Sequence, residues 1–220
     1  MLTSHEMVSI TNKYDYAQAL TTVIGIGAIV IPKLLISDSI PFLTIRERSD
    51  KPATGKNRTR GIPQETIKVD AGTKVPESPE TTLQALILEE LLGAIGVGKI
   101  GHHFHTPVSG REIVSLPSLP GKAGRIEVVI YDGNPESLLE YNSYQSETTS
   151  PLYLTKLADD NTTRATSRDL LKAAQKLKLL HQGLLYYNLG NTQRVFHPEF
   201  NPDQFLRQRT PQPDITSVIN

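Results

Sequence analysis

The sequence contains no cysteine, and this absence removes several classes of protein at once. Disulfide scaffolds, zinc sites with cysteine ligands, iron–sulfur clusters and thiol nucleophiles all require that residue. Net charge is absent too, because 23 Lys plus Arg balance 23 Asp plus Glu, so no chain-wide field attracts nucleic acid or an anionic membrane. Any charged partner must therefore be recognised by a local patch.

Long hydrophobic runs are also missing. The longest, residues 23–30 (VIGIGAIV), is far short of the roughly 18 to 20 apolar residues that cross a bilayer. Glu6 and Asp15 stand where a secretory signal would carry basic residues, and no small-residue cleavage site follows them. We therefore expect a chain that is made in the cytoplasm, is not secreted through a signal peptide and has no membrane span.

The apolar residues that are present predict strands by their alternation. Residues 23–30 and 125–131 are rich in β-branched side chains at period two, which is typical of buried strands. The glycines of the first strand would let another backbone come close. Shorter or weaker strands are expected at 113–116 and 152–157.

Two segments have the periodicity of amphipathic helices. The first covers residues 80–95, with Ser78 as its N-cap, and the second covers residues 167–187, with Gly190 at its end. A short helix is expected at 135–141. Together with the strands, these helices predict an α+β fold whose compact core is a small mixed or antiparallel sheet with two main helices.

Two polar segments are expected to project from this core. Residues 40–45 and 65–69 predict a β-hairpin around a long basic loop, which we place at 46–64. Residues 191–220 contain four prolines and few clustered apolar residues, which indicates an extended C-terminal arm. The predicted organisation is one α+β domain at 1–190 followed by this arm.

Residues 96–101 (GVGKIG) resemble the glycine-rich turn of the NAD-dependent dehydrogenases. In that family a helix begins within the motif, and an acid about 20 residues further on binds the ribose. Here Pro107 follows closely, and residues 115–124 contain no acid. We therefore predict that the glycines end the helix of 80–95 and begin a loop, and an NAD-dependent oxidoreductase is the least favoured alternative.

Other candidate chemistry is incomplete. His102, His103 and His105 carry the side chain that most often binds zinc, but adjacent side chains point apart and no acid is close in sequence, so metal binding stays open. Ser109 lacks the first glycine of a nucleophile elbow. Residues 53–56 (ATGK) lack the upstream glycine and the Ser or Thr of a P-loop. We therefore predict that the chain is not an enzyme and that it has no catalytic residue and no cofactor.

Charge is nevertheless segregated along the chain. Basic residues dominate 46–60, whereas 126–150 contains acids and no Lys or Arg. This pattern fits ordinary surface charge, phosphate contact by the loop, or pairing between copies of the chain. The partner-contact candidates are Arg46, Arg48, Lys51, Lys56, Arg58, Arg60, Phe196, Phe200 and Phe205.

These observations lead to a hypothesis of assembly. A basic loop and a long arm gain stability by burying surface on neighbours, so we expect a structural protein of a large multi-subunit particle whose partners are copies of itself and neighbouring subunits. The specific hypothesis is a phage virion component, in the neck, tail or capsid, or a phage-tail-like machine. The main alternative is a nucleic-acid-binding module that uses the basic loop.

Overall fold

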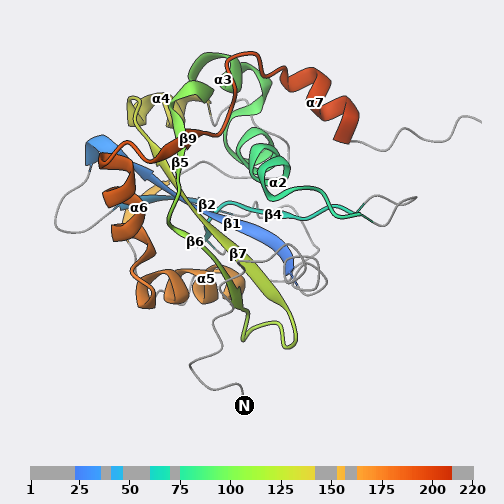
Figure 1. The fold of residues 1–220 in the computed structure, drawn as a ribbon, viewed down its shortest axis with the longest axis vertical. Helices are drawn as coiled ribbons and strands as arrows, with labels where there is room; N and C mark the ends of the chain where they lie inside the picture. Colours follow the sequence, from blue (N-terminus) through green and yellow to red (C-terminus); the bar gives the residue numbers. More distant parts are fainter. Residues whose placement is uncertain are drawn as a thin grey trace, which may run out of the picture.

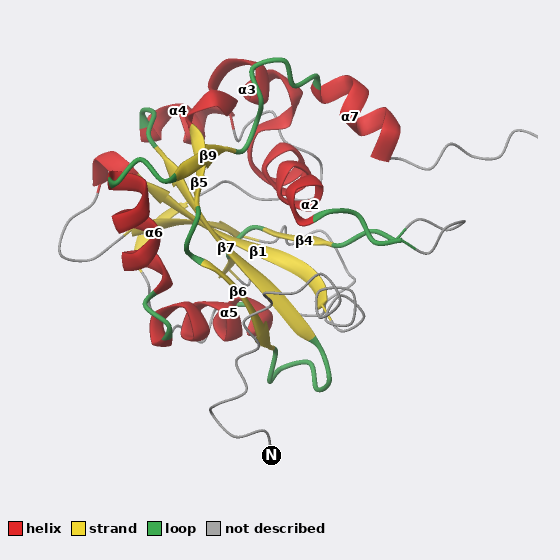
Figure 2. Cartoon of the chain, viewed as in Figure 1, coloured by secondary structure: helices red, strands yellow, loops and turns green. Residues whose placement is uncertain are grey.

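A mixed β-sheet lies at the centre of the molecule, with helices on both of its faces (Figures 1 and 2). The computed structural model describes residues 23–35, 41–46, 60–69, 75–141, 153–156 and 163–209. Within these ranges the sheet and several helices form an α+β fold, so the predicted fold class is confirmed.

The large sheet has six strands, in the order β4-β1-β7-β5-β9, with β6 also paired to β7. Strands β1 and β7 are parallel, and the other pairs are antiparallel. The strands are β1 (Val23–Pro32), β4 (Gln64–Thr66), β5 (Phe104–Pro107), β6 (Arg111–Ser115), β7 (Ala123–Tyr131) and β9 (Thr192–Arg194). The predicted strands at 23–30, 113–116 and 125–131 are thus present, whereas β5 and β9 were not predicted.

The strands of the predicted hairpin at 40–45 and 65–69 do not pair with each other. Strand β2 (Pro41–Arg46) pairs antiparallel with the two-residue strand β3 (Arg60–Gly61) and with β8 (Tyr153–Lys156), which together make a separate small sheet. Residues 64–66, expected to complete the hairpin, pair with β1 instead. After the two residues of β3, the chain stops pairing with β2 and pairs with β1, because the glycine face of β1 lets another backbone come close. A Cβ on Gly25 would lie 2.6 Å from the carbonyl oxygen of Glu65.

Alternation along the two central strands divides the hydrophobic core into two layers. On one face, Ile26, Ala28 and Val129 pack under the helices that follow β4. On the other face, Ile29 and Val128 pack against the helices of residues 165–188. The period of two that predicted these strands is therefore the pattern that separates the layers.

Both long predicted helices are interrupted. The first is α2 (Pro79–Leu86), then a π-helix (Ile87–Leu92), then α3 (Gly93–Ile100), so the glycines do not begin a loop at residue 96. The second divides at Lys178, which has a left-handed φ of 55°, into α5 (Ala165–Lys176) and α6 (Leu179–Asn188). Ser78 caps α2 as predicted, since its Oγ accepts a hydrogen bond from the backbone N–H of Thr81 at 3.1 Å.

The remaining elements are short. Helix α4 (Pro135–Tyr141) lies where it was predicted. Two 3-10 turns are η1 (Lys33–Leu35) and η4 (Gly101–His103). The segment predicted as an extended arm contains β9 at an edge of the sheet and helix α7 (Pro202–Arg209), so residues 192–209 are structured. Residues 210–220 lie outside the described ranges.

Candidate functional site

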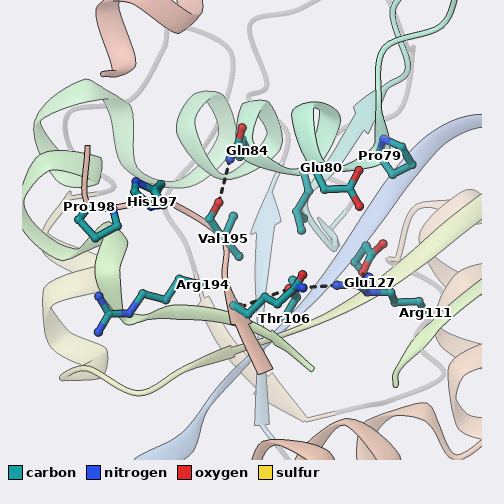
Figure 3. A pocket seen from close by; sticks show the side chains of 12 residues that line it. Pro79, Glu80, Gln84, Thr106, Arg111, Glu127, Arg194, Val195, His197 and Pro198 are labelled. Atoms are coloured by element: carbon teal, nitrogen blue, oxygen red, sulfur yellow. Dashed lines mark hydrogen bonds and ion pairs between the residues drawn. The ribbon is translucent and has the colours of Figure 1, made fainter. Parts of the chain in front are cut away.

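A cavity lies between helix α2 and the face of the sheet that α2 covers (Figure 3). Its volume is about 360 Å³, a size that binds small organic ligands. Apolar groups, including Leu83 of α2 and Val195 after β9, form part of its lining. The polar side chains that line it are Glu80, Gln84, Thr106, Arg111, Glu127, Gln193, Arg194 and His197.

Glu127 is the buried charge of this cavity, and it comes from the central strand β7. Arg125 donates a hydrogen bond from Nε to Oε1 of Glu127 at 2.6 Å, and Nε of Arg111 lies 3.3 Å from Oε2. Arg111 also donates from Nη2 to Oγ1 of Thr106 at 3.2 Å. Arg111 is thus held at the cavity wall by its hydrogen bond to Thr106 and by an ion pair with Glu127, although Nε and Oε2 themselves form no hydrogen bond.

The burial of Glu127 sets its contacts with Arg125 and Arg111 apart from ordinary surface ion pairs. Burial raises the pKa of Glu127, while the charges of Arg125 and Arg111 act in the opposite direction. Removing Arg125, which is 13% exposed and donates the hydrogen bond at 2.6 Å, would leave the charge of Glu127 poorly compensated, at a cost of about 3–5 kcal/mol. Perturbed ionisable groups of this kind gather at functional sites, so this end of the cavity is the candidate site.

The two carboxylates of the cavity differ in their access to solvent. Glu127 is 2% exposed, whereas Glu80 is exposed in the first turn of α2. Figure 3 shows Glu80 at the same end as Glu127 and Arg111, with Arg194 and His197 at the other end. One end can thus take a proton from water beside a fixed guanidinium, and the other can bind an anionic group.

A second charged cluster brings three carboxylates around Arg209, the last residue of α7. Its Nη2 donates to Oε1 of Glu65 at 2.8 Å and to Oε1 of Glu77 at 2.9 Å, and its Nη1 donates to Oε1 of Glu89 at 2.6 Å. Nε adds a bond to Oε2 of Glu77 at 3.1 Å. The Arg209 side chain is 4% exposed. We call these four residues the carboxylate cluster.

The carboxylates of this cluster respond differently to the same arginine. Burial raises the pKa of Glu65 and outweighs its bond to Arg209. Burial also acts to raise the pKa of Glu77, but hydrogen bonds from Arg209, the backbone N–H of Lys68 and the hydroxyl of Thr82 outweigh it, so that pKa is lowered. The bonds to the carboxylates raise the pKa of Arg209 despite its burial. Burial therefore sets the direction of the pKa shift only for Glu65, whereas hydrogen bonds and opposite charges set it for Glu77 and Arg209.

The histidines at 102–105 have an acid partner that is distant in sequence. Asp132 lies 2.7 Å from Nδ1 of His103 and 3.0 Å from Nε2 of His105, and it accepts a hydrogen bond from the Tyr187 hydroxyl at 2.9 Å. These side chains join β5, the end of β7 and α6. Across the described ranges, no group of three or more His, Asp or Glu side chains is placed to hold a metal ion.

The predicted partner contacts divide between described and undescribed residues. Arg46 and Arg60 form a register pair at the base of the β2–β3 hairpin. Arg48, Lys51, Lys56 and Arg58 lie outside the described residues.

The three phenylalanines of the predicted arm lie within the fold. Phe196 is 3% exposed in the hydrophobic core, and Phe200 and Phe205 are partly buried against that core. The ring of Phe200 lies 4.9 Å from that of Phe196 and 5.2 Å from that of Phe205, measured between centroids. Their contacts are therefore made within the chain, and Phe196 has almost no surface left for a partner.

The glycine-rich motif does not form a dinucleotide site. The resemblance to the dehydrogenase turn requires a strand before the glycines, but residues 87–92 are a π-helix and 93–100 are an α-helix. Gly93, with a φ of 63°, turns the chain between these two helices. Gly96 has no room for a side chain, because a Cβ there would lie 2.9 Å from Cβ of Leu92. The alternative of an NAD-dependent oxidoreductase is wrong.

Sequence reasoning missed the residues of the cavity. Glu127 is one of the acids of 126–150 that the charge pattern assigns to the surface, and Glu80 stands in the first turn of the predicted helix at 80–95, where an acid suits the helix dipole. One signal was available: alternation in RIEVVIY places Glu127 on the same face as Val129 and Tyr131, which predicts a buried acid. Arg111 and Arg194 gave no such signal, because the fold alone brings them to the cavity.

Comparison with known proteins gives a structural match only. No family model and no curated protein sequence matches the chain. An Ap4A hydrolase from C. elegans has a TM-score of 0.43 at 14% identity, over 74% of this chain and 98% of its own. The NUDIX domain of Shewanella oneidensis NrtR with ADP ribose has a TM-score of 0.39 at 14% identity, over 79% of this chain and 99% of its own.

A third matching structure carries both a nucleotide and a metal. It is a bifunctional NMN adenylyltransferase/ADP ribose pyrophosphatase from Francisella tularensis, complexed with AMP and a manganese ion. Its TM-score is 0.40 at 14% identity, over 77% of this chain and 44% of its own. In this chain, three carboxylates surround the guanidinium of Arg209, and the described residues hold no group of acids and histidines placed to bind a metal ion.

These matches correct the predicted function. The matching structures are named as hydrolases, a pyrophosphatase and a NUDIX domain, so the prediction of a phage virion or other structural component is wrong, as is the prediction of no enzyme. At TM-scores below 0.5 we take no substrate from them as evidence. Self-association and nucleic-acid contact stay predictions. None of the helices in the described ranges is long and apolar enough to span a bilayer.

Proposed function

We propose that the chain is a hydrolase that cleaves a phosphoric anhydride bond in the cavity between α2 and the sheet. The observation that carries the proposal is the placement of an accessible carboxylate, Glu80, at the same end of the cavity as the fixed guanidinium of Arg111. A general base and a phosphate-binding cation are the two groups that such a reaction needs from side chains.

The reaction would use these groups in a defined order. Arg111 binds a phosphoryl oxygen of the substrate, because guanidinium matches the geometry of phosphate. Glu80 accepts a proton from a water molecule, whose oxygen forms a bond to phosphorus while the bridging P–O bond breaks. The leaving phosphate departs with the bridging oxygen. Glu127 is a positioning residue, since it acts through Arg111.

The substrate class follows from the two ends of the cavity. Arg194 and His197 offer cationic or hydrogen-bonding groups to a second anionic part, and the apolar lining between the ends accepts a ring. A nucleotide with a phosphoanhydride link combines these features. Ap4A and ADP ribose, which occur in the names of matching structures, are convenient first substrates to test.

The test compares two acids that occupy the same place in different helices. Glu80 and Glu136 are both exposed in the first turn of a helix, but only Glu80 lines the cavity. Glu80→Gln should lower kcat by about 10²-fold or more with KM little changed, as expected for loss of a general base. Glu136→Gln should keep wild-type kinetics. Phosphate release from a panel of nucleoside diphosphate-linked compounds measures both.

The positioning role of Glu127 gives a second readout. Glu127→Gln weakens the hold on Arg111, so KM should rise as well as kcat fall, and Arg111→Lys should behave in the same way. A wild-type chain that hydrolyses no compound of the panel would overturn the proposed function. Full activity of Glu80→Gln would overturn the assignment of the base.

A further inference from the structure

The carboxylate cluster brings three negative groups from different parts of the chain to one cation. Glu65 comes from β4, Glu77 precedes α2, and Glu89 lies in the π-helix. Three carboxylates this close would repel one another strongly in a partly buried setting. The cation that bonds to all three arrives from the C-terminal helix α7, far along the chain.

The geometry of the cluster suits a guanidinium better than a metal ion. The oxygens lie 2.6–3.1 Å from three different nitrogens of Arg209, so they are spread along the edges of its planar group. A divalent cation instead needs its oxygens to converge on one point, at about 2.0–2.6 Å. Glu77 is held in its present place from two further sides, because the backbone N–H of Lys68 and the hydroxyl of Thr82 donate to its Oε1 at 3.1 and 3.0 Å.

We propose that Arg209 is the resident cation of the carboxylate cluster, and that α7 acts as a strap that keeps this cluster closed to divalent cations. The segment 196–209, which carries α7 at its end, is anchored at both ends. Phe196 is buried in the core at one end, and Arg209 is bonded to the carboxylates at the other. Releasing Arg209 leaves three carboxylates free to gather around a hard cation, so the arginine and the metal are competing occupants.

Manganese binding tests this proposal directly and without any activity assay. Free Mn²⁺ is followed by electron paramagnetic resonance during titration of the full chain, as wild type, Arg209→Gln and the control Arg207→Gln, an exposed cation on the same helix. Arg209→Gln should gain one site that binds Mn²⁺ at least about tenfold more tightly than wild type, because the carboxylates lose their resident cation. Arg207→Gln should match wild type, and adding Glu77→Gln to Arg209→Gln should remove the new site.

Two results would overturn the proposal. One is a wild-type chain that already binds Mn²⁺ as tightly as Arg209→Gln, at a site that Glu77→Gln removes. The other is a folded Arg209→Gln, checked by circular dichroism, that gains no site. If this variant does not fold, hydrogen exchange of the wild-type α7 amides decides instead. Exchange that is unchanged by millimolar Mn²⁺ supports the strap, and faster exchange contradicts it.

Discussion

At the scale of single residues, the charged side chains of this protein obtain their partners through the fold. Asp132 is the clearest case, because its partners come from two segments distant from it in sequence: His103 and His105 from one, and Tyr187 from the other. Burial acts to raise the pKa of Asp132, but hydrogen bonds from His103 and Tyr187 outweigh it and lower that pKa. The pKa of His105 is also lowered, in this case by burial, to below 6.5. Both shifts favour the folded state at neutral pH.

Acid should therefore destabilise the protein in two windows. The contribution of His105 is present above pH 6.5 and is lost as the pH falls from there through its folded pKa. The contribution of Asp132 is present above pH 3.8 and is lost as the pH falls below that value. Urea unfolding at pH 7, 5 and 3 measures the decline.

A variant identifies the part that Asp132 contributes. Asp132→Asn should lower the free energy of unfolding at pH 7 by about 1–3 kcal/mol, because it weakens charged hydrogen bonds to partly buried donors. Its difference from wild type should shrink as the pH falls below 3.8, because the unfolded chain takes up a proton there while folded Asp132, whose pKa is lowered, does so only in stronger acid. Asp203→Asn, at an exposed position in α7, serves as the control. A difference that stays constant with pH would contradict the ionised role of Asp132.

At the scale of elements, two glycines should respond to the same substitution with opposite signs. Gly25 lies where β1 and β4 approach, and a Cβ there would be 2.6 Å from the Glu65 carbonyl oxygen. Gly98 lies in α3, where a Cβ would meet nothing within 4 Å. Gly25→Ala should destabilise the protein by about 1–3 kcal/mol through overpacking. Gly98→Ala should stabilise it by about 0.5–1 kcal/mol, and urea unfolding of both variants distinguishes the two outcomes.

Hydrophobic pattern predicted where elements lie better than where they stop. The strands at 23–32 and 123–131 have strong alternation, which no competing signal masks. The helices were predicted as single units because their apolar stripes continue across the interruptions. Those interruptions are a left-handed conformation at Lys178 and a π-helix at 87–92. The residues at these positions do not favour either geometry, so the sequence does not predict them. Strand β9 was missed because three polar residues form it at a sheet edge.

At the scale of the whole molecule, the segment after β9 belongs to the fold that it closes. Phe196 is buried in the core, and Arg209 ties the end of α7 to three other elements. Phe196→Ala should therefore cost about 3–5 kcal/mol of stability, as for other buried aromatic residues. Phe205→Ala, at a partly buried position, should cost clearly less. Equal and negligible losses for both would show that this segment is not part of the cooperative unit.

The fold class was readable from the sequence, but the candidate site was not. Alternating and amphipathic patterns report which face of an element is buried, and this is enough to predict an α+β architecture. The cavity instead depends on residues from α2, β6, β7 and β9 that meet only after folding. The basic loop can be recognised in the sequence because its charges are close together along the chain. The charges of the cavity and of the carboxylate cluster are close together only in space.

The most direct test of this account is the steady-state hydrolysis of nucleoside diphosphate-linked compounds by the wild-type chain, Glu80→Gln and Glu136→Gln. If Glu80 is the general base of a hydrolase, wild type and Glu136→Gln should cleave phosphoanhydrides measurably, and Glu80→Gln should lose about 10²-fold or more in kcat. Absence of cleavage by the folded wild-type chain, or equal kcat for all three proteins, would contradict it.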